Sequence, residues 1–374
     1  MQMGGAEKVL EVLHAMFPNA PVYTSAYDPE VMPSHFREWD IRTSFLQRLW
    51  MKRKSHRLAL PLYPMAFESF DFTGYDLVIS SSSSFAKGVI TGPGTHHLCY
   101  TYTPMRFAWF TGHYTERERM GSLARMALAP VTHYLRLWDA VAASRVDSYV
   151  AISSVVQQRI SKYYRRTSEI IYPPVETDRF AISKEVDDYY IVVSRMIPYK
   201  RLDLAVEAFS RMRKQLKVVG TGRQLAELRA GAGDSVQFLG HVSNADLPGL
   251  IARARGYVMP GEEDFGIAPV EANACGRPVI AYGAGGALDT QIDGRTGILF
   301  GEPTVDSLCD AVNRAEQTEF DPRIIRDHAK GFDTSVFESR LRSAIGRAIN
   351  PAEPSMPTFA TVRTLEKQPV QAGR

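Results

Sequence analysis

The chain has 374 residues, of which 45% are hydrophobic and 23% are charged, and its formal net charge at pH 7 is +3. This balance is typical of a folded protein, the length suits two domains of moderate size, and the near-neutral charge gives no reason to expect nucleic acid as a partner. The cysteines Cys99, Cys275 and Cys309 lie far apart without metal-ligand spacing, so we expect free, buried thiols and no metal site.

The N-terminal half predicts an irregular α/β arrangement. The amphipathic segment 6–16 predicts a helix, and short apolar runs at 77–80, 98–101 and 148–152 predict strands. Long loops and helices at about 102–145 lie between the second and third of these strands. No run approaches the roughly 20 apolar residues that a membrane span requires, and the first residues lack the pattern of a signal peptide, so we expect a cytoplasmic protein.

The second half predicts a more regular structure. Short β-branched runs alternate with amphipathic helical segments, which favours βαβ units and a parallel sheet. The runs are continuously apolar, as expected for strands in a sheet that is covered on both faces. The predicted strands lie at 190–194, 216–220, 236–240, 256–260 and 278–282.

These patterns also divide the chain. The paired prolines in 172–177 cannot continue a helix, so we place an interdomain hinge there. We expect an N-terminal Rossmann-like domain at 1–172, a C-terminal Rossmann-like domain at 173–331 and a helix at 332–349 that crosses back to the first domain. The polar, proline-rich tail at 350–374 predicts disorder.

The most informative stretch follows the strand that ends at Pro260. An acidic loop leads to Gly266, which opens an apolar, helix-compatible run. Glycine at such a turn lets a ligand approach the backbone, and a helix N-terminus offers free N–H groups to an anion. The carboxylates of Glu263 and Glu271 flank the turn and can accept paired hydrogen bonds from the vicinal hydroxyls of a sugar or ribose. Anion site and diol acceptors together favour a nucleotide-sugar; otherwise Glu263 is a solvated loop charge and Glu271 a surface helix residue.

The stretch from Glu263 to Glu271, with seven residues between the two acids, resembles the EX7E motif of glycosyltransferase family 4, which has the GT-B fold. Further segments resemble that family in the same order, and GGAEKVLEVLHAMFPNAPVYTS at 4–25 resembles members that build bacterial surface polysaccharides, several of them mannosyltransferases. The further segments are IYPPVETDRF, SRMIPYKRLDLAVEAF, VVGTGRQ, FLGHVS and DGRTGILF. The resemblance implies two Rossmann-like domains facing a central cleft, and a retaining hexosyltransferase with no protein nucleophile.

The resemblance also implies roles for residues of this chain. Glu263 holds hydroxyls of the donor sugar and Glu271 the ribose, while further donor contacts come from Gly4, Gly5, Phe265, Gly266 and Ile267. Arg195 and Lys200 neutralise the diphosphate, where preorganised cations stabilise the charge that develops on the leaving group. The alternative for both Arg195 and Lys200 is an ordinary surface cation without a ligand. We find no acidic DxD pair beside a strand, so we expect metal-independent transfer with no cofactor.

Acceptor contacts are expected from the first half, across the cleft. The segment 99–110 carries Tyr102, Arg106 and Trp109; aromatic rings stack on sugars, and arginine can meet the phosphate of a lipid carrier. A packed loop is the alternative, and many relatives have histidine in place of Tyr102. The basic amphipathic stretch at 47–57 predicts peripheral contact with an anionic membrane, with a solvated helix face as the alternative.

Relatives carry a strand before the GGAE segment, whereas here only Met1, Gln2 and Met3 precede Gly4. The sequence before Gly4 is too short to supply the first N-domain strand, which we therefore expect to be missing. We expect a truncated or misassigned start; the alternative is an exposed sheet seam with weakened donor binding.

The resemblance therefore implies a hexosyltransferase, and we expect it to move mannose from GDP-mannose to a glycan or an undecaprenyl diphosphate-linked acceptor in surface polysaccharide biosynthesis. A UDP-sugar-dependent transferase and a non-catalytic nucleotide-sugar-binding assembly partner are alternatives. A third alternative is another enzyme with two Rossmann domains. A dehydrogenase of this kind should show a GxGxxG motif after its first strand, and we find no such motif.

Overall fold

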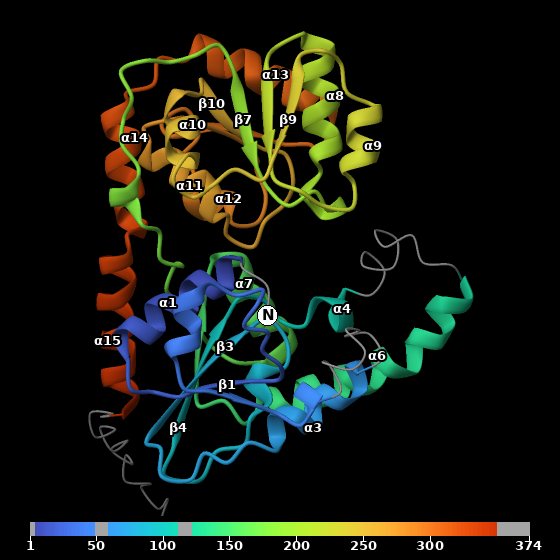
Figure 1. Cartoon of the computed structure of the whole chain (residues 1–374), viewed down its shortest axis with the longest axis vertical. Helices are drawn as coiled ribbons and strands as arrows, with labels where there is room; N and C mark the ends of the chain where they lie inside the picture. The colour runs from blue at the N-terminus through green and yellow to red at the C-terminus, as the bar shows by residue number, and fades with distance from the viewer. Residues whose placement is uncertain (1–3, 49–58, 111–121, 350–374) are drawn as a thin grey trace, which may run out of the picture.

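The computed structural model describes residues 4–48, 59–110 and 122–349. The basic stretch at 47–57 lies mostly outside the described residues, and the tail at 350–374 lies wholly outside them. Figure 1 shows two α/β halves, one above the other, joined along one side by α14 and α15. The cysteines Cys99, Cys275 and Cys309 are free and buried, which confirms the prediction that their thiols are unpaired and lie in the core.

In the described part of the C-terminal half, six parallel strands form one sheet in the order β12-β11-β10-β7-β8-β9. The strands predicted from the apolar runs are all present, and β12 joins them at the edge of the sheet. The chain order reverses between β10 and β7, and such a switch point opens a crevice at the carboxyl ends of the strands. The strands are β7 Tyr190–Val193, β8 Leu216–Val219, β9 Val236–Gly240, β10 Gly256–Met259, β11 Val279–Tyr282 and β12 Gly297–Phe300.

Helices cover both faces of this sheet. Neighbouring strand residues alternate between two buried clusters: Val192 and Val258 pack against α8 and α13, whereas Ile191 and Tyr257 belong to the cluster that contains α10 and α11. Burial on both faces is the reason that the strands are continuously apolar. The helices are α8 Leu202–Met212, α9 Leu225–Ala230, α10 Leu247–Arg253, α11 Ile267–Ala274, α12 Ala287–Thr290, α13 Val305–Gln317 and α14 Pro322–Ala329.

The N-terminal half contains a smaller parallel sheet, in the order β3-β4-β5-β6, and a separate pair, β1-β2. Within the described residues no strand precedes α1. The strands are β1 Val22–Thr24, β2 Ile41–Thr43, β3 Leu77–Ser82, β4 His96–Thr101, β5 Ser148–Ala151 and β6 Glu169–Ile170. The helices are α1 Gly5–Met16, α3 Tyr63–Glu68, α4 Arg106–Trp109, α6 Ser122–Ala143 and α7 Ser154–Tyr164.

Short 3-10 helices occur in both halves and at the junction between them. In chain order they are η1 Ser34–Glu38, η2 Leu60–Leu62, η3 Ala86–Gly88, η4 Thr177–Arg179, η5 Pro198–Lys200 and η6 Lys330–Phe332.

The two halves are joined by chain segments that run side by side. The amide of Val175 donates to the carbonyl of Phe332 (3.0 Å), and the amide of Thr334 donates to the carbonyl of Val175 (3.1 Å). The chain therefore passes into the C-terminal half and returns from it at the same place. The returning helix α15 (Thr334–Ile349) lies on the N-terminal sheet, where Phe337 packs edge-on against Tyr100 with ring centroids 5.6 Å apart.

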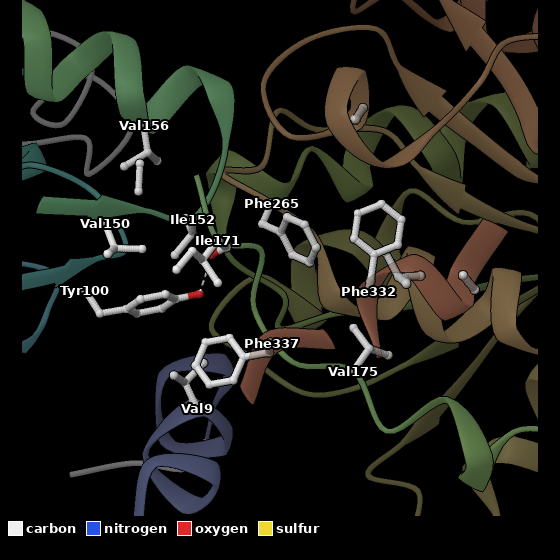
Figure 2. Close-up of a cluster of buried hydrophobic side chains, with 14 of the residues drawn as sticks. Val9, Tyr100, Val150, Ile152, Val156, Ile171, Val175, Phe265, Phe332 and Phe337 are labelled. Atoms are coloured by element: carbon white, nitrogen blue, oxygen red, sulfur yellow. Dashed lines mark hydrogen bonds between the residues drawn. The ribbon is translucent and has the colours of Figure 1, made fainter. Parts of the chain in front are cut away.

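A continuous apolar cluster lies beneath this crossing. Figure 2 shows Val9 and Tyr100 of the N-terminal half on one side and Phe265 and Phe332 on the other, with Ile171 between them. The hydroxyl of Tyr100 donates to the carbonyl of Ile171 (3.0 Å), which satisfies the polar end of this buried ring. The shared core holds the loop that carries Phe265 close to the N-terminal half.

Candidate active site

The loop between β10 and α11 depends on glycines for its path. Gly266 caps α11 with a φ of +93°, a conformation that favours glycine, and a β-carbon there would lie 3.2 Å from Sδ of Met259. On the other side, the amide of Gly286 donates to the carbonyl of Glu263 (2.8 Å). The backbone at Glu263 is thereby fixed, and the free N–H groups of the first turn of α11 lie next to it.

Lys200 and Glu263 form an ion pair at the carboxyl ends of the central strands. Lys200 ends η5, which follows β7, and its side chain is 18% exposed, while that of Glu263 is 17% exposed. Arg195 lies on the same wall and is exposed. Because Glu263 neutralises the charge on Lys200, an anionic ligand has to take the place of this carboxylate or share the lysine with it.

These residues line a cleft of about 750 Å³ between the two halves. The ends of β7 and β10 form part of its wall, as the switch point of the sheet requires. The structure brings most of the sequence-predicted site residues together here: Gly4, Gly5, Tyr102, Arg106, Arg195, Lys200, Glu263, Phe265, Gly266 and Ile267. A phosphate, a sugar and a helix N-terminus can therefore meet in one place.

Two predicted residues lie elsewhere. Glu271 is buried, forms an ion pair with Lys8 of α1 (2.8 Å) and lines a smaller cavity of about 210 Å³. Trp109 is not among the described residues that line the cleft; its Nε1 donates to the buried carboxylate of Asp139 (2.7 Å), and its ring packs on Tyr163. The structure thus gives both side chains partners that the sequence pattern did not indicate.

Tyr102 lines the cleft, but its hydroxyl is occupied. It donates to the carbonyl of Ala6 (3.1 Å) and shares a hydrogen bond with Oγ of Ser81 (2.8 Å). Burial raises the pKa of Tyr102 well above its usual value, so the phenol stays neutral. Tyr102 therefore braces the first turn of α1, next to Gly4 and Gly5.

Sequence reasoning missed several charged residues of this region. Glu7 lines the cleft, and burial raises its pKa, an effect partly offset by its own backbone N–H and by Arg195. Asp264 forms an ion pair with Arg106; burial disfavours the charged guanidinium, but the carboxylate outweighs burial and the pKa of Arg106 rises. The position of Asp264 beside a motif acid is a signal that could have found it, whereas no spacing rule points to Glu7.

The described residues contain no group of three or more His, Cys, Asp or Glu side chains that could hold a metal ion. Among the helices within the described ranges, none combines the length and the apolar character needed to traverse a bilayer.

Two α/β halves, each with a parallel sheet, and a cleft at the strand ends define a GT-B glycosyltransferase fold. The chain is similar to the crystal structure of Anabaena HepE in complex with UDP, with a TM-score of 0.66 and 18% identity over 92% of this chain and 98% of that one. It is also similar to sucrose-phosphate synthase from Thermosynechococcus elongatus, with a TM-score of 0.69 and 19% identity over 92% of each chain. Residues 175–331, which lie in the C-terminal half, match the family described as glycosyl transferases group 1.

Curated relatives agree with this class. A GDP-mannose-dependent alpha-(1-6)-phosphatidylinositol monomannoside mannosyltransferase of Mycobacterium tuberculosis is 32% identical over 44% of this chain and 51% of its own length. A glycogen synthase of Pseudomonas syringae pv. tomato is 25% identical over 72% of this chain and 54% of its own length. The chain thus spans about half the length of these relatives.

Proposed function

We propose that the protein is a retaining glycosyltransferase that moves mannose from GDP-mannose to a hydroxyl of a lipid-linked or oligosaccharide acceptor in surface polysaccharide biosynthesis. One observation carries the proposal: Arg195, Lys200 and Glu263 line a single cleft with the N-terminus of α11. The preference for GDP-mannose is supported by the mannosyltransferase relative at 32% identity.

The chemistry follows from the charges. The diphosphate gains negative charge as the glycosidic bond breaks, and Arg195 and Lys200 would stabilise it, each by on the order of 3 kcal/mol. Glu263 would hold hydroxyls of the donor sugar once Lys200 turns to the diphosphate. These cations and the helix N-terminus can together replace a metal ion, so we infer metal-independent transfer.

The test begins with thermal-shift measurements of the protein in the presence of GDP-mannose, UDP-glucose or ADP-glucose, because a bound donor stabilises the fold by mass action. GDP-mannose should raise the midpoint most, and its turnover should survive EDTA. Midpoints that shift only with UDP-sugars would show that the donor is wrong. Binding without hydrolysis or transfer would instead favour a non-catalytic nucleotide-sugar-binding partner.

The site itself is tested by Glu263→Gln, which should lower donor hydrolysis and transfer on the order of 100-fold. Glu185→Gln is the matched control, since Glu185 is a carboxylate of the same half whose side chain is 75% exposed in a surface pair with Arg253. Equal activity of the two variants would refute the assignment of Glu263.

A lipid-linked acceptor is supported by the outer face of α6. Met126, Leu137 and Val141 are 69%, 57% and 59% exposed on this helix. Figure 1 shows α6 extending away from the rest of the N-terminal half. The side chain of Arg136, also on α6, donates to the carbonyl of Ala108 in α4 (2.9 Å), so this helix adjoins the segment that carries Arg106. We infer that α6 rests on the inner face of the cell membrane, where it would bring the acceptor to the cleft.

A further inference from the structure

One carboxylate of the C-terminal half is bound by two guanidinium groups of the N-terminal half. Asp264, which directly follows Glu263, forms ion pairs with Arg106 of α4 and Arg159 of α7. The side chains of Asp264 and Arg159 are 13% and 15% exposed, so solvent screens this contact less than a surface pair. We call Asp264, Arg106 and Arg159 the Asp264 clasp.

Arg159 connects segments of the two halves next to the cleft. Besides Asp264, its guanidinium donates to Oε1 of Glu262 (3.1 Å) and to Oγ1 of Thr103 (3.3 Å), and it lies over the ring of Phe110 at 5.3 Å. Glu262 belongs to the loop after β10, whereas Thr103 and Phe110 belong to the segment from which we expect acceptor contacts. Arg159 therefore joins the donor side of the cleft to the acceptor side.

The helix that carries Arg159 is itself docked across the cleft. At its first residue, the amide and the hydroxyl of Ser154 donate to Oδ2 of Asp289, at 3.1 Å and 2.8 Å. Asp289 lies on α12 of the C-terminal half and accepts the hydroxyl hydrogen of Tyr172 as well (3.2 Å to Oδ1). Contacts at two points along α7 fix its orientation relative to the loop after β10.

The clasp acts on the residue beside it. The backbone of Glu263 is fixed from the C-terminal half by the amide of Gly286, and the next side chain, Asp264, is fixed from the N-terminal half. Separation of the halves would break the ion pairs of Asp264 but leave the hydrogen bond from Gly286 to Glu263 intact. Closure of the cleft therefore adds a constraint on the backbone beside Glu263, whose carboxylate is paired within its own half with Lys200.

We propose that Asp264 and Arg159 are positioning residues that couple closure of the two halves to the orientation of Glu263. The proposal rests on the function proposed above for its kinetic part and on the ion pairs alone for its conformational part. Misplacement of a reacting group by about 1 Å can cost on the order of 100-fold in rate, so loss of the clasp should slow turnover strongly.

The experiment compares Asp264→Asn, Arg159→Met and the double variant. The matched controls are Asp187→Asn and Arg253→Met, which remove a surface ion pair (2.8 Å) within the C-terminal half. For each variant we would measure folding by circular dichroism, the radius of gyration by small-angle X-ray scattering, the Kd for GDP, and kcat and KM for GDP-mannose.

The clasp variants should have a larger radius of gyration than wild type, a kcat lowered by about 10- to 100-fold, and a Kd for GDP within about twofold of wild type. The double variant should be no slower than the slower single variant, because both substitutions remove the same contact. Arg159→Lys, which keeps the charge, should recover part of the activity.

Variants that fold and retain the scattering profile and kcat of wild type would overturn the proposal, as would a parallel loss of GDP affinity. A wild-type protein that turns over no nucleotide-sugar would refute the proposed function. The scattering comparison would still decide whether the clasp closes the cleft.

Discussion

Asp139 is the centre of a buried polar network beneath the segment expected to contact the acceptor. Its side chain is 0% exposed and that of its ion-pair partner Lys87 is 1% exposed. The carboxylate also accepts hydrogen bonds from Nε1 of Trp109 (2.7 Å) and from the hydroxyl of Tyr164 (2.9 Å). Asp139→Asn keeps the size of the side chain and removes its charge.

The loss of stability in Asp139→Asn can be estimated from these contacts. Breaking a buried ion pair by removing one partner costs about 3–5 kcal/mol, because the remaining charge is left without compensation. The ammonium group of Lys87 also lies over the rings of Trp138 and Tyr164, at 5.3 Å and 5.0 Å, and these contacts would stabilise the remaining charge in part. We therefore expect the free energy of unfolding to fall by about 3 kcal/mol.

Urea denaturation followed by circular dichroism measures this loss. The Lys87→Met/Asp139→Asn double variant should recover part of it, because no charge is then left without a partner and the asparagine oxygen can still accept a hydrogen bond. Asp306→Asn, at a side chain that is 76% exposed, should change stability by less than about 0.5 kcal/mol. A loss below about 1 kcal/mol for Asp139→Asn, or a double variant as unstable as the single one, would refute the reasoning.

Two further perturbations address pH and the membrane. Burial lowers the pKa of His97 to about 4, so the neutral ring contributes stability that is complete above pH 6.5 and is lost as the pH falls towards 4. The loss in the free energy of unfolding should be about 3 kcal/mol. His97→Gln should remove this part of the pH dependence in urea titrations, and an equal change of stability with pH in the variant and wild type would contradict the prediction. Leu137→Gln and Val141→Gln should each lower the affinity for anionic vesicles, measured by co-sedimentation, by about tenfold. Leu288→Gln is the control, at a residue of the C-terminal half that is 60% exposed, and it should leave this affinity unchanged. Unchanged binding by both α6 variants would show that α6 does not contact the membrane.

The fold of the C-terminal half was predictable because its strands are short, apolar and regularly separated by helices. In the N-terminal half, β1, β2 and β6 have only two or three residues each, too few to show a period of two. The edge strand β12 escapes prediction for another reason: only the four-residue helix α12 lies between β11 and β12, which is too short to mark a βαβ unit in the sequence. Length and context, rather than composition, limited the prediction.

Residues of the candidate site also differ in how far the sequence could predict them. Glu263 and Gly266 lie in one loop, so local spacing was enough to place them at a strand-to-helix turn. Arg159 and Asp264 are separated by 105 positions, and Lys87 and Asp139 by 52. No spacing rule relates residues so far apart, because their approach depends on how whole helices pack. Sequence patterns can therefore indicate the donor side of this cleft, while its connection to the acceptor side needs the structure.

The pairing of charges around the cleft affects ligand selection under the proposed function. Lys200, which lines the cleft, already has a carboxylate partner in Glu263. Inorganic phosphate could displace Glu263 from Lys200, but it would leave the partly buried carboxylate without a donor, and an unpaired buried polar group is costly. A nucleotide-sugar brings a diphosphate for the cation and hydroxyls for the acid, so both partners are replaced together. The paired state thus discriminates against simple anions, which an exposed pair of lysines would not do.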